Sequence, residues 1–398
     1  MAGTRRKAGQ LAPQVEGYRA WLKQRGYTSP TVRNMLKDLG QIGSWLSAKG
    51  LSAGDLSEER LAEFLGARRA AGWRRVPGMR GMAPLLGYLR EASVVAVIDS
   101  PPTPLDALLG RYRSWMERER GLAESTVLRY ENTAQRFLTE QAMADGVLTP
   151  ERLGGSDINA FLLRECDRVS AGSAKGRVAE LRSLLRFLHL QGDLPQKLGT
   201  AVPPVGGWRF ATVPPTMAVA DVQVLLDRCG RDTITTVRDY AILMLLARLG
   251  LRSIEVARLE LRDVDWRAGE IIVRGKGRRE DRMPLPTEVG EALAAYLSSD
   301  RGPRPTRHLF VTCRAPRGPI RADLVGDVVQ RACLRAGLPH VGPHRLRHAL
   351  AGEMLRQGAG LVAIGQVLRH QDLATTALYA KVDLTALRQV AQVWPEDS

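Results

Sequence analysis

The stretch GPHRLRHALAGEML, residues 342–355, decides how the C-terminal part of this chain is interpreted. Proline is favoured at the first position of a helix, where its missing N–H would have no partner anyway, so Pro343 predicts a helix start. Three polar residues then share one face of this helix, because they lie three and four positions apart: His344, Arg347 and His348. The helix is one of four polar stretches that indicate a chemical function only when they are considered together.

The other three stretches are LGLRSIEVARL (249–259), RGKGRREDR (274–282) and LRHQDLATTALYAKVD (368–383). In the first, Arg252 follows a Gly-Leu break and Glu255 lies one helical turn later. In the second, Lys276 stands at the tip of a predicted β-hairpin, because GKG is a turn sequence between extended runs. In the third, His370 lies nine residues before Tyr379.

Each stretch alone has a purely structural explanation. An Arg–Glu pair three residues apart is ordinarily a surface ion pair worth roughly a few tenths of a kcal/mol, and a tyrosine ordinarily packs its ring into a core. The GKG turn lacks the GxxxxGK[ST] spacing of a phosphate-binding P-loop. Histidines recur every four residues at His340, His344 and His348, but no HExxH glutamate or cysteine cluster accompanies them, so we expect no metal site.

Together, two arginines, a lysine, histidines and a tyrosine supply what phosphodiester transfer without a metal requires. A pair of guanidinium groups stabilises the negative charge of the transition state at phosphorus. A tyrosine hydroxyl attacks phosphorus and conserves the bond energy in a covalent intermediate. A lysine on a hairpin can protonate the departing 5′-oxygen, and histidines can contact the phosphate or accept the tyrosine proton.

On these residues, positions 216–394 resemble the catalytic domain of the tyrosine recombinase (phage-integrase) family. The positions similar to the family's catalytic motifs are Arg252 and Glu255 (its Arg-x-x-Glu box), Lys276 (its hairpin lysine), His344, Arg347 and His348 (its His-x-x-Arg-His box), His370 (its second histidine) and Tyr379 (its nucleophile). Two positions depart from the pattern: Ile254 replaces a small residue, and Arg369 replaces the glycine before the second histidine. Neither departure removes a reacting group.

The resemblance implies a site-specific DNA recombinase that cleaves and rejoins duplex DNA through a 3′-phosphotyrosyl bond, without metal, ATP or other cofactor. It implies these roles: nucleophile for Tyr379, phosphate clamp for Arg252 and Arg347, general acid for Lys276, assistance from His344 and His370, and support from His348 and Glu255. The implied partners are double-stranded DNA with specific recombination sites, further protomers in a homotetramer on synapsed DNA, and sister recombinases or accessory factors. The segment LRQVAQVW (387–394) is a candidate for docking on a neighbouring protomer. Integration, transposition and resolution of multimers stay open as biological roles.

The charge balance agrees with a nucleic-acid partner. Among 398 residues, 58 Lys and Arg stand against 42 Asp and Glu, a formal net charge of +16, and such a surplus favours a polyanion. The cysteines lie far apart, as buried thiols in a reducing compartment do: Cys166, Cys229, Cys313 and Cys333. The start of the chain has no apolar core and the longest apolar run, 241–247, is too short to span a bilayer. We therefore expect no membrane association and a cytoplasmic, nucleoid-associated protein.

Two similar stretches precede the catalytic part. YRAWLKQRGYTSPTV (18–32) and YRSWMERERGLAESTV (112–127) each carry a Tyr-Trp pair, a glycine and a Ser/Thr helix cap. Each is followed by a Leu-Ser/Thr-x-Glu helix start and a Leu/aromatic helix, which predicts a duplicated small helical domain. Proline-rich linkers at 94–106 and 196–216 then divide the chain into an additional helical module (1–100), a module that resembles the family's core-binding domain (104–195) and the catalytic domain (216–398).

The predicted fold class is mainly α. Two small all-α modules precede a mostly helical domain, whose small antiparallel sheet arises from the strand-turn-strand pattern of residues 262–286. The first module is interpreted as a second core-type DNA-binding domain, an arm-site binder or a protein–protein element, and its basic runs at 5–7, 67–69 and 73–75 favour DNA. Two other function classes stay open: a type IB topoisomerase, which shares the phosphotyrosine chemistry, and a non-catalytic DNA-binding relative.

Overall fold

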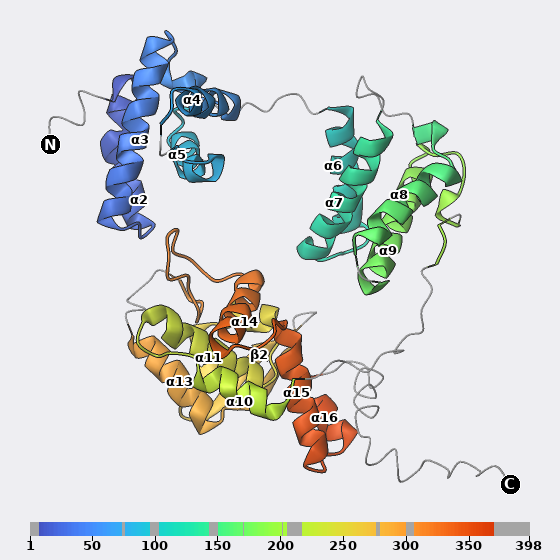
Figure 1. Cartoon of the computed structure of the whole chain (residues 1–398). Helices are drawn as coiled ribbons and strands as arrows, with labels where there is room; N and C mark the ends of the chain where they lie inside the picture. Colours follow the sequence, from blue (N-terminus) through green and yellow to red (C-terminus); the bar gives the residue numbers. More distant parts are fainter. Residues whose placement is uncertain are drawn as a thin grey trace. The chain divides into compact units, whose positions relative to one another are not determined.

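The structure is a computed structural model that describes residues 8–73, 76–95, 103–142, 150–169, 171–200, 202–204, 217–275, 279–299 and 306–369. Figure 1 shows that helices dominate and that the small sheet belongs to the C-terminal part. The chain divides into two compact units, Val97–Ala211 and the combination of Met1–Ala96 with Thr212–Ser398. Both boundaries fall inside the predicted linkers, whereas the three-domain division itself stays a prediction.

Residues 8–95 fold as a helical module around their own hydrophobic cluster. Its elements are η1 (Gly9–Gln14), α2 (Val15–Gln24), α3 (Ser29–Ala48), η2 (Ala53–Asp55), α4 (Glu58–Ala70) and α5 (Met79–Glu91). Aromatic rings from α2 and α5 meet in the core, where the ring centroid of Tyr18 lies 6.0 Å from that of Trp21 and 5.2 Å from that of Tyr88. Ser57 caps α4 as predicted, because its hydroxyl accepts a hydrogen bond from the Arg60 N–H (3.2 Å).

Residues 103–204 form a second helical module with a separate hydrophobic cluster. Its elements are α6 (Pro104–Arg118), α7 (Glu124–Gln141), η3 (Pro150–Arg152), α8 (Gly155–Asp167), α9 (Ala171–Leu190) and η4 (Leu198–Thr200). Here the ring centroid of Tyr112 lies 6.1 Å from that of Trp115 and 5.1 Å from that of Phe187. The predicted Ser/Thr cap of α7 is wrong: Ala123 occupies the N-cap position, and Ser125 and Thr126 lie within the first turn.

The two modules bury equivalent positions on equivalent helices. Matching buried pairs come from α3 and α7, from α4 and α8, and from α5 and α9: Val32 and Val127, Phe64 and Phe161, Tyr88 and Phe187. An arginine that follows the first helix of each module lies over the tryptophan ring of that helix, Arg25 at 3.7 Å and Arg120 at 5.3 Å from the ring centroid. These matches support the predicted duplication.

The C-terminal part is built around a helix that is buried on all sides. Its elements are α10 (Val219–Asp227), α11 (Ile234–Arg248), α12 (Ser253–Arg258), η5 (Leu261–Asp263), β1 (Val264–Asp265), β2 (Glu270–Arg274), β3 (Glu280–Pro284), α13 (Thr287–Ser298), α14 (Ala322–Ala336), α15 (Pro343–Arg356) and α16 (Leu361–Val367). Every residue of the run 241–247 in α11 is buried, as a helix that is hydrophobic on all faces requires. Helices α10, α13, α14 and α15 pack against it.

The sheet has the order β1-β2-β3 and is antiparallel throughout. Ile271 of β2 lies opposite Val264 of β1 and Met283 of β3, so the central strand buries its apolar side chain between two others. The predicted strand-turn-strand is confirmed, and β1 adds a short third strand that the sequence pattern did not single out. Residues 276–278 of the turn lie outside the described residues.

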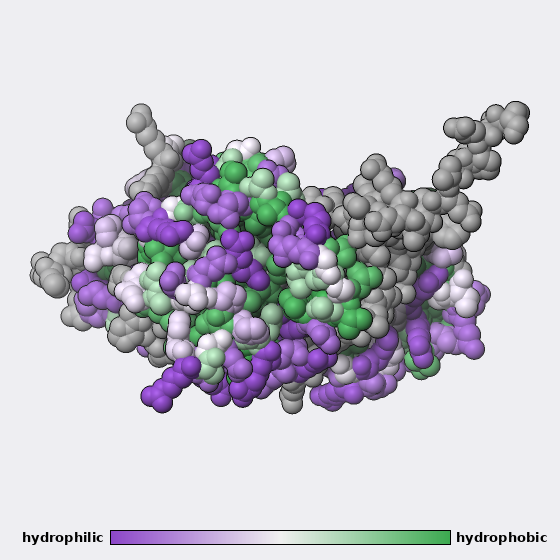
Figure 2. Space-filling model, turned by 90° about the horizontal axis from the view of Figure 1, so that it is seen from below, coloured by the Kyte–Doolittle hydropathy of each residue, from purple (hydrophilic) through white to green (hydrophobic). Residues whose placement is uncertain are grey.

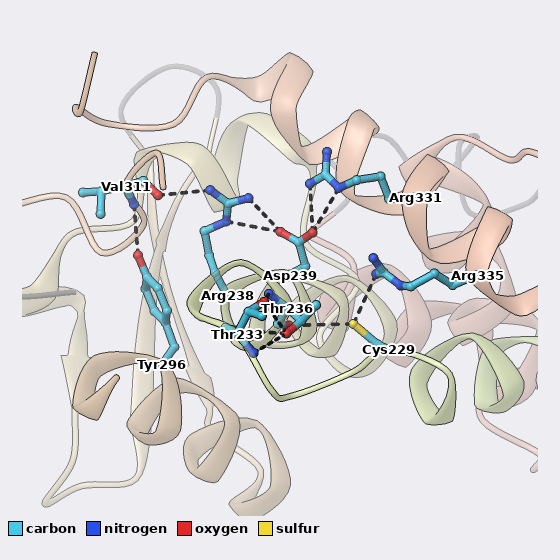
Figure 3. A network of polar contacts seen from close by, with 9 residues as sticks. All are labelled: Cys229, Thr233, Thr236, Arg238, Asp239, Tyr296, Val311, Arg331 and Arg335. Atoms are coloured by element: carbon cyan, nitrogen blue, oxygen red, sulfur yellow. Dashed lines mark hydrogen bonds and ion pairs between the residues drawn. The ribbon is translucent and has the colours of Figure 1, made fainter. Parts of the chain in front are cut away.

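A buried polar network joins α11 to its neighbours (Figure 3). The carboxylate of Asp239, which is 0% exposed, accepts from Arg238 at Oδ1 (2.8 Å) and from Arg331 of α14 at Oδ2 (2.8 Å). Arg238 also donates to the carbonyl of Val311 (3.3 Å), whose N–H donates to the hydroxyl of Tyr296 in α13 (3.2 Å). Because each carboxylate oxygen has its own guanidinium, the buried charge is compensated and α11, α13 and α14 are fixed as one frame.

The predicted fold class is confirmed: the described residues are mainly helical, with one small antiparallel sheet. The face of the molecule in Figure 2 has hydrophobic patches separated by hydrophilic residues. Among the described helices, none combines the length and the apolar character needed to cross a membrane.

Candidate active site

Arg252 occupies the N-cap position of α12. Its backbone N–H donates to Glu255 Oε2 (2.8 Å) and its Nη1 donates to Glu255 Oε1 (2.6 Å). The helix begins here because the Glu255 carboxylate accepts a backbone N–H that would otherwise lack a partner, as the acidic residue of a capping box does. The Arg252 side chain stays 33% exposed, so its guanidinium is accessible from solvent.

Glu255 is almost completely buried, with 2% of the residue exposed. Burial alone would raise the pKa of its carboxyl group, but the charge of Arg369 and the hydrogen bonds from Arg252 outweigh burial and lower the pKa. Glu255 is therefore ionised at neutral pH. The two arginines that keep it ionised come from α12 and from the segment after α16.

Arg347 lies on α15, which begins at Pro343 as predicted. It is 3% exposed, and it donates from Nη1 to the Gly250 carbonyl and from Nη2 to the Leu368 carbonyl. Arg252 reaches the same place, because its Nη2 donates to the carbonyl of Arg369 (3.4 Å). We call these contacts of Arg252 and Arg347 with Gly250, Leu368 and Arg369 the arginine junction. The junction brings together residues that are about 120 positions apart in the sequence.

Gly250 is the one position of the junction where a side chain has no room. Its φ of +57° lies in the left-handed region, which favours glycine. A Cβ at this position would lie 2.8 Å from Cδ2 of Leu368 and 3.1 Å from Cδ2 of Leu350. Glycine at the Gly-Leu break before Arg252 therefore lets the chain pass close to α15 and the end of α16.

His344 and His348 lie on the same helix as Arg347. His344 is exposed, yet the protein atoms around its ring, and then the charges of Arg347 and Arg252, lower its pKa. Burial, followed by the charges of His344 and Arg347, likewise lowers the pKa of His348. Both imidazoles are therefore neutral at neutral pH. In the described part of the chain, no three His, Cys, Asp or Glu side chains are grouped as metal ligands would be.

Arg369 departs from the family pattern, and its contacts are not predicted by any sequence motif. Its side chain is 5% exposed and its Nη2 donates to Glu255 Oε2 at 2.8 Å. The available signal was a long charged residue in place of a glycine next to the candidate site. Ile254, the other departure, is 43% exposed on α12, so it does not disturb the packing of that helix.

Three predicted site residues lie outside the described residues: Lys276, His370 and Tyr379. The strands that flank Lys276 are present, and the Gly275 N–H donates to the Arg279 carbonyl (2.8 Å) across the base of the turn. His370 directly follows Arg369 in the sequence. Of the predicted site, the described structure brings together Arg252, Glu255, His344, Arg347 and His348.

The second module carries an arginine cluster that no sequence motif indicated. Two buried carboxylates, Glu165 (3% exposed) and Glu180 (2%), hold the guanidinium groups of α7, α8 and α9. The ion pairs are Arg129–Glu180 (2.8 Å), Arg136–Glu165 (3.1 Å), Arg168–Glu165 (3.9 Å), Arg177–Glu180 (2.8 Å) and Arg177–Glu165 (3.4 Å). The glutamates are hidden while the side chains of Arg129 and Arg136 stay 58% and 45% exposed, so this face presents positive charge to solvent.

Comparisons with known proteins place these features in a family. Residues 216–385 match the model of the phage integrase family. The chain is 36% identical over 396 residues to a putative integrase/recombinase, y4rA, of Sinorhizobium fredii, with 98% of this chain and 96% of that protein covered. It is 31% identical over 298 residues to the tyrosine recombinase XerD of Mycobacterium tuberculosis, with 70% of this chain and 94% of XerD covered.

The fold is also similar to a solved structure. The crystal structure of the XerH site-specific recombinase bound to palindromic difH substrate, in its post-cleavage complex, gives a TM-score of 0.57 at 16% identity, over 75% of this chain and 99% of XerH. The match to y4rA spans the first module as well as the other two, whereas the match to XerD covers a smaller share of the chain. The chain therefore belongs to the phage integrase family and is a tyrosine recombinase.

Proposed function

We propose that this enzyme cleaves and rejoins double-stranded DNA at specific recombination sites, with Tyr379 as the nucleophile. The observation that carries the proposal is the arginine junction, in which Arg252 and Arg347 converge on the carbonyls of residues 368 and 369. The segment with His370 and Tyr379 follows directly in the sequence.

The net positive charge at and next to the arginine junction favours binding of a phosphodiester. Three guanidinium groups, those of Arg252, Arg347 and Arg369, stand against the single carboxylate of Glu255, and Arg252 is the partly exposed member. Fixed positive charge stabilises the oxygens that become more negative in the transition state, and it needs no reorganisation during the reaction. In this assignment Arg252 and Arg347 bind the scissile phosphate, and Glu255 orients Arg252. Arg347 is 3% exposed and donates to the Gly250 and Leu368 carbonyls, so binding of the phosphate by Arg347 requires that one of these carbonyls gives way to a phosphate oxygen.

The chemistry is balanced without an external energy source. The Tyr379 hydroxyl gives up its proton and forms an O–P bond, the bond from phosphorus to the 5′-oxygen breaks, and Lys276 protonates that oxygen. The lowered pKa keeps His344 neutral, so it can accept a proton or a hydrogen bond at the site. His370 assists at the phosphate, and His348 supports the helix that carries Arg347. Religation reverses these steps, so neither ATP nor a cofactor takes part.

The second module is proposed to hold the DNA next to this site. Its arginine cluster supports the proposal, because exposed guanidinium groups that bind phosphates release condensed counterions from the duplex. The buried Glu165 and Glu180 restrict the arginines before DNA arrives, which reduces the entropy lost on binding. Contacts of this kind set affinity and orientation, whereas sequence is recognised by contacts to base edges.

The wider assembly follows from the same proposal. Strand exchange between two sites needs four cleavages, so we propose a homotetramer on synapsed DNA, with residues 387–394 as a candidate docking segment outside the described residues. Sister recombinases or accessory factors would set directionality, and the enzyme would act on nucleoid DNA in the cytoplasm. The first module is proposed as an additional DNA-binding or protein-binding element.

The nucleophile is tested with Tyr379→Phe and a nicked suicide substrate that traps the covalent complex. The variant is expected to keep its affinity for DNA, because only one hydroxyl is removed, and to form no SDS-resistant complex. Tyr240→Phe, at a partly buried tyrosine of α11, serves as the matched control and is expected to form the complex. A covalent complex with Tyr379→Phe would assign the nucleophile to another residue.

The alternatives are separated by two further assays. A type IB topoisomerase would relax supercoiled plasmids that lack any cognate site, whereas a site-specific recombinase would act only where its sites are present. A non-catalytic DNA-binding relative would bind the suicide substrate and never form a covalent complex with it. The genomic neighbourhood would distinguish integration from transposition, through an attachment site or flanking inverted repeats.

A further inference from the structure

Arg369 adopts a backbone conformation that suits glycine. Its φ is +54°, and among the described non-glycine residues only Ser93 shares a positive φ. A Cβ in the left-handed region is unfavourable, so a long side chain at this position must make contacts that offset the strain. The family's usual glycine would occupy the position without strain, so the arginine is a strained departure from the family pattern.

The side chain of Arg369 is inserted between three elements of the site. Its Nη2 donates to Glu255 Oε2 of α12 (2.8 Å), and its Nη1 donates to the Val367 carbonyl of α16 (3.1 Å) and contacts the sulfur of Met283 in β3. Its own carbonyl accepts from Arg252 Nη2 (3.4 Å). Arg369 thus touches both partners of the Arg252–Glu255 pair and the strand that leads away from the Lys276 turn.

These contacts change the net charge of the group formed by Arg252 and its ion-pair partner. Glu255 alone would neutralise Arg252, because the two form a close ion pair in which the carboxylate is 1% exposed. Arg369 binds the other carboxylate oxygen, so the three groups together keep one positive charge. Arg369 is buried and Arg252 is 33% exposed, so the exposed side of this positive group is Arg252.

We propose that Arg369 is a positioning residue of the recombination reaction, which compensates Glu255 so that Arg252 is free to stabilise the scissile phosphate. This inference rests on the proposed function of the arginine junction. It predicts that Arg369 affects the cleavage step more than DNA affinity, because its buried guanidinium does not reach DNA and acts through Glu255 and Arg252. Where the family has glycine, no second cation shares the glutamate from this position.

The test measures single-turnover cleavage of the suicide substrate at saturating enzyme, together with the Kd for DNA. Arg369→Gln is expected to slow cleavage about tenfold, which corresponds to about 1.4 kcal/mol of lost transition-state stabilisation. The Kd for DNA is expected to change less than about twofold. Arg369→Lys is expected to retain most of the rate, because it keeps the charge. Arg356→Gln, at an exposed ion pair of α15, is the matched control and is expected to cleave at the wild-type rate.

A charge-balanced double variant separates the electrostatic role from a structural one. Glu255→Gln with Arg369→Gln removes one charge of each sign, so the net charge next to Arg252 returns to its original value. Its cleavage rate is expected to exceed that of Arg369→Gln alone. Arg369→Gly, which also relieves the backbone strain, keeps the test valid if the glutamine variant fails to fold, and it too is expected to cleave slowly.

Two outcomes would overturn the inference. One is wild-type cleavage by a folded Arg369→Gly or Arg369→Gln, and the other is equal slowness of Arg369→Gln and the double variant at unchanged melting temperature. Failure of the proposed function is recognised separately, because it would appear as a covalent complex with Tyr379→Phe whatever the Arg369 variants do.

Discussion

Gly250 is a residue of the arginine junction at which a side chain would be crowded. Gly250→Ala would force a β-carbon into Leu368 and Leu350 at a φ of +57°. We expect a loss of about 1–3 kcal/mol in the free energy of unfolding, and a lower melting temperature of about 2–4 °C for each kcal/mol. The cleavage rate should fall as well, since the Gly250 carbonyl accepts from Arg347.

Gly352 provides the matched control for this substitution. It lies on α15, and a Cβ there would meet no atom within 4 Å. Gly352→Ala is therefore expected to leave the melting temperature unchanged or to raise it, because alanine is favoured over glycine in a helix by about 1 kcal/mol. Equal melting temperatures for Gly250→Ala and wild type would contradict the close approach at the junction.

The histidines of α15 predict how cleavage depends on pH. The pKa of His344 is lowered from its ordinary 6.5, so the neutral imidazole persists to more acidic pH than an exposed histidine would allow. The acid limb of the single-turnover cleavage rate is therefore expected to have its midpoint below pH 6.5 and to disappear in His344→Asn. A wild-type midpoint at or above 6.5 would show that His344 does not act as a neutral group.

The lowered pKa values of His344 and His348 also make the stability of the folded state depend on pH. The pKa of His344 and of His348 is lower in the folded state than in the unfolded state, so below pH 6.5 the unfolded chain binds more protons. The free energy of unfolding should fall as the pH decreases from 6.5 through the lowered pKa values. His348→Asn should reduce this dependence in urea-unfolding experiments, whereas a steeper dependence would contradict the assignment.

At the scale of elements, α7, α8 and α9 are joined through their ion pairs into one basic face. Arg136→Ala is expected to weaken DNA binding and to reduce the slope of log K against log salt by about 1, because one phosphate contact is lost. Loss of the ion pair between Arg136 and Glu165 should reduce stability little, since Glu165 keeps its ion pairs with Arg177 and Arg168. Arg111→Ala, whose side chain pairs with Asp193 outside the cluster, is the control. Equal salt slopes for both variants would exclude a phosphate contact at Arg136.

Elements also show what local sequence patterns can predict. The starts of α15 at Pro343 and of α4 at Ser57 and the hairpin of β2 and β3 are all predicted, because capping and turn chemistry act over a few residues. The cap of α7 is predicted wrongly, since Ser125 and Thr126 lie inside the helix and Ala123 at its N-cap makes no side-chain hydrogen bond.

At the scale of the whole molecule, the two helical modules differ on equivalent faces. At the positions of Arg129, Arg136, Arg168 and Arg177 in the second module, the first module has Asn34, Gln41, Ala71 and Gly78. The buried Glu165 is replaced by Arg68, which is 8% exposed and donates to Gln41. At these described positions the first module therefore has no counterpart of the arginine cluster, although the buried apolar positions of the two modules match.

This difference predicts the outcome of a truncation. Removal of residues 1–100 is expected to leave the footprint of the second and third modules on DNA intact, with a Kd changed by less than about tenfold, the effect of roughly 1.4 kcal/mol. Footprinting of the full chain and of the truncated chain checks this expectation. A footprint that shortens by a discrete segment would show instead that the first module binds DNA.

The helical class, the small sheet, the order of the reacting residues and the membership of the family can be predicted from the sequence, because these depend on residue type and spacing. Which charged side chains contact one another depends on the packing of the folded chain. Arg369 binds Glu255 across 114 positions of sequence, and Arg136 and Arg177 share Glu165 across helix boundaries. Such contacts depend on how helices pack and where side chains point, and no local pattern encodes that geometry. The packing explains Arg369, which is the second arginine bound to Glu255, the glutamate that also binds Arg252.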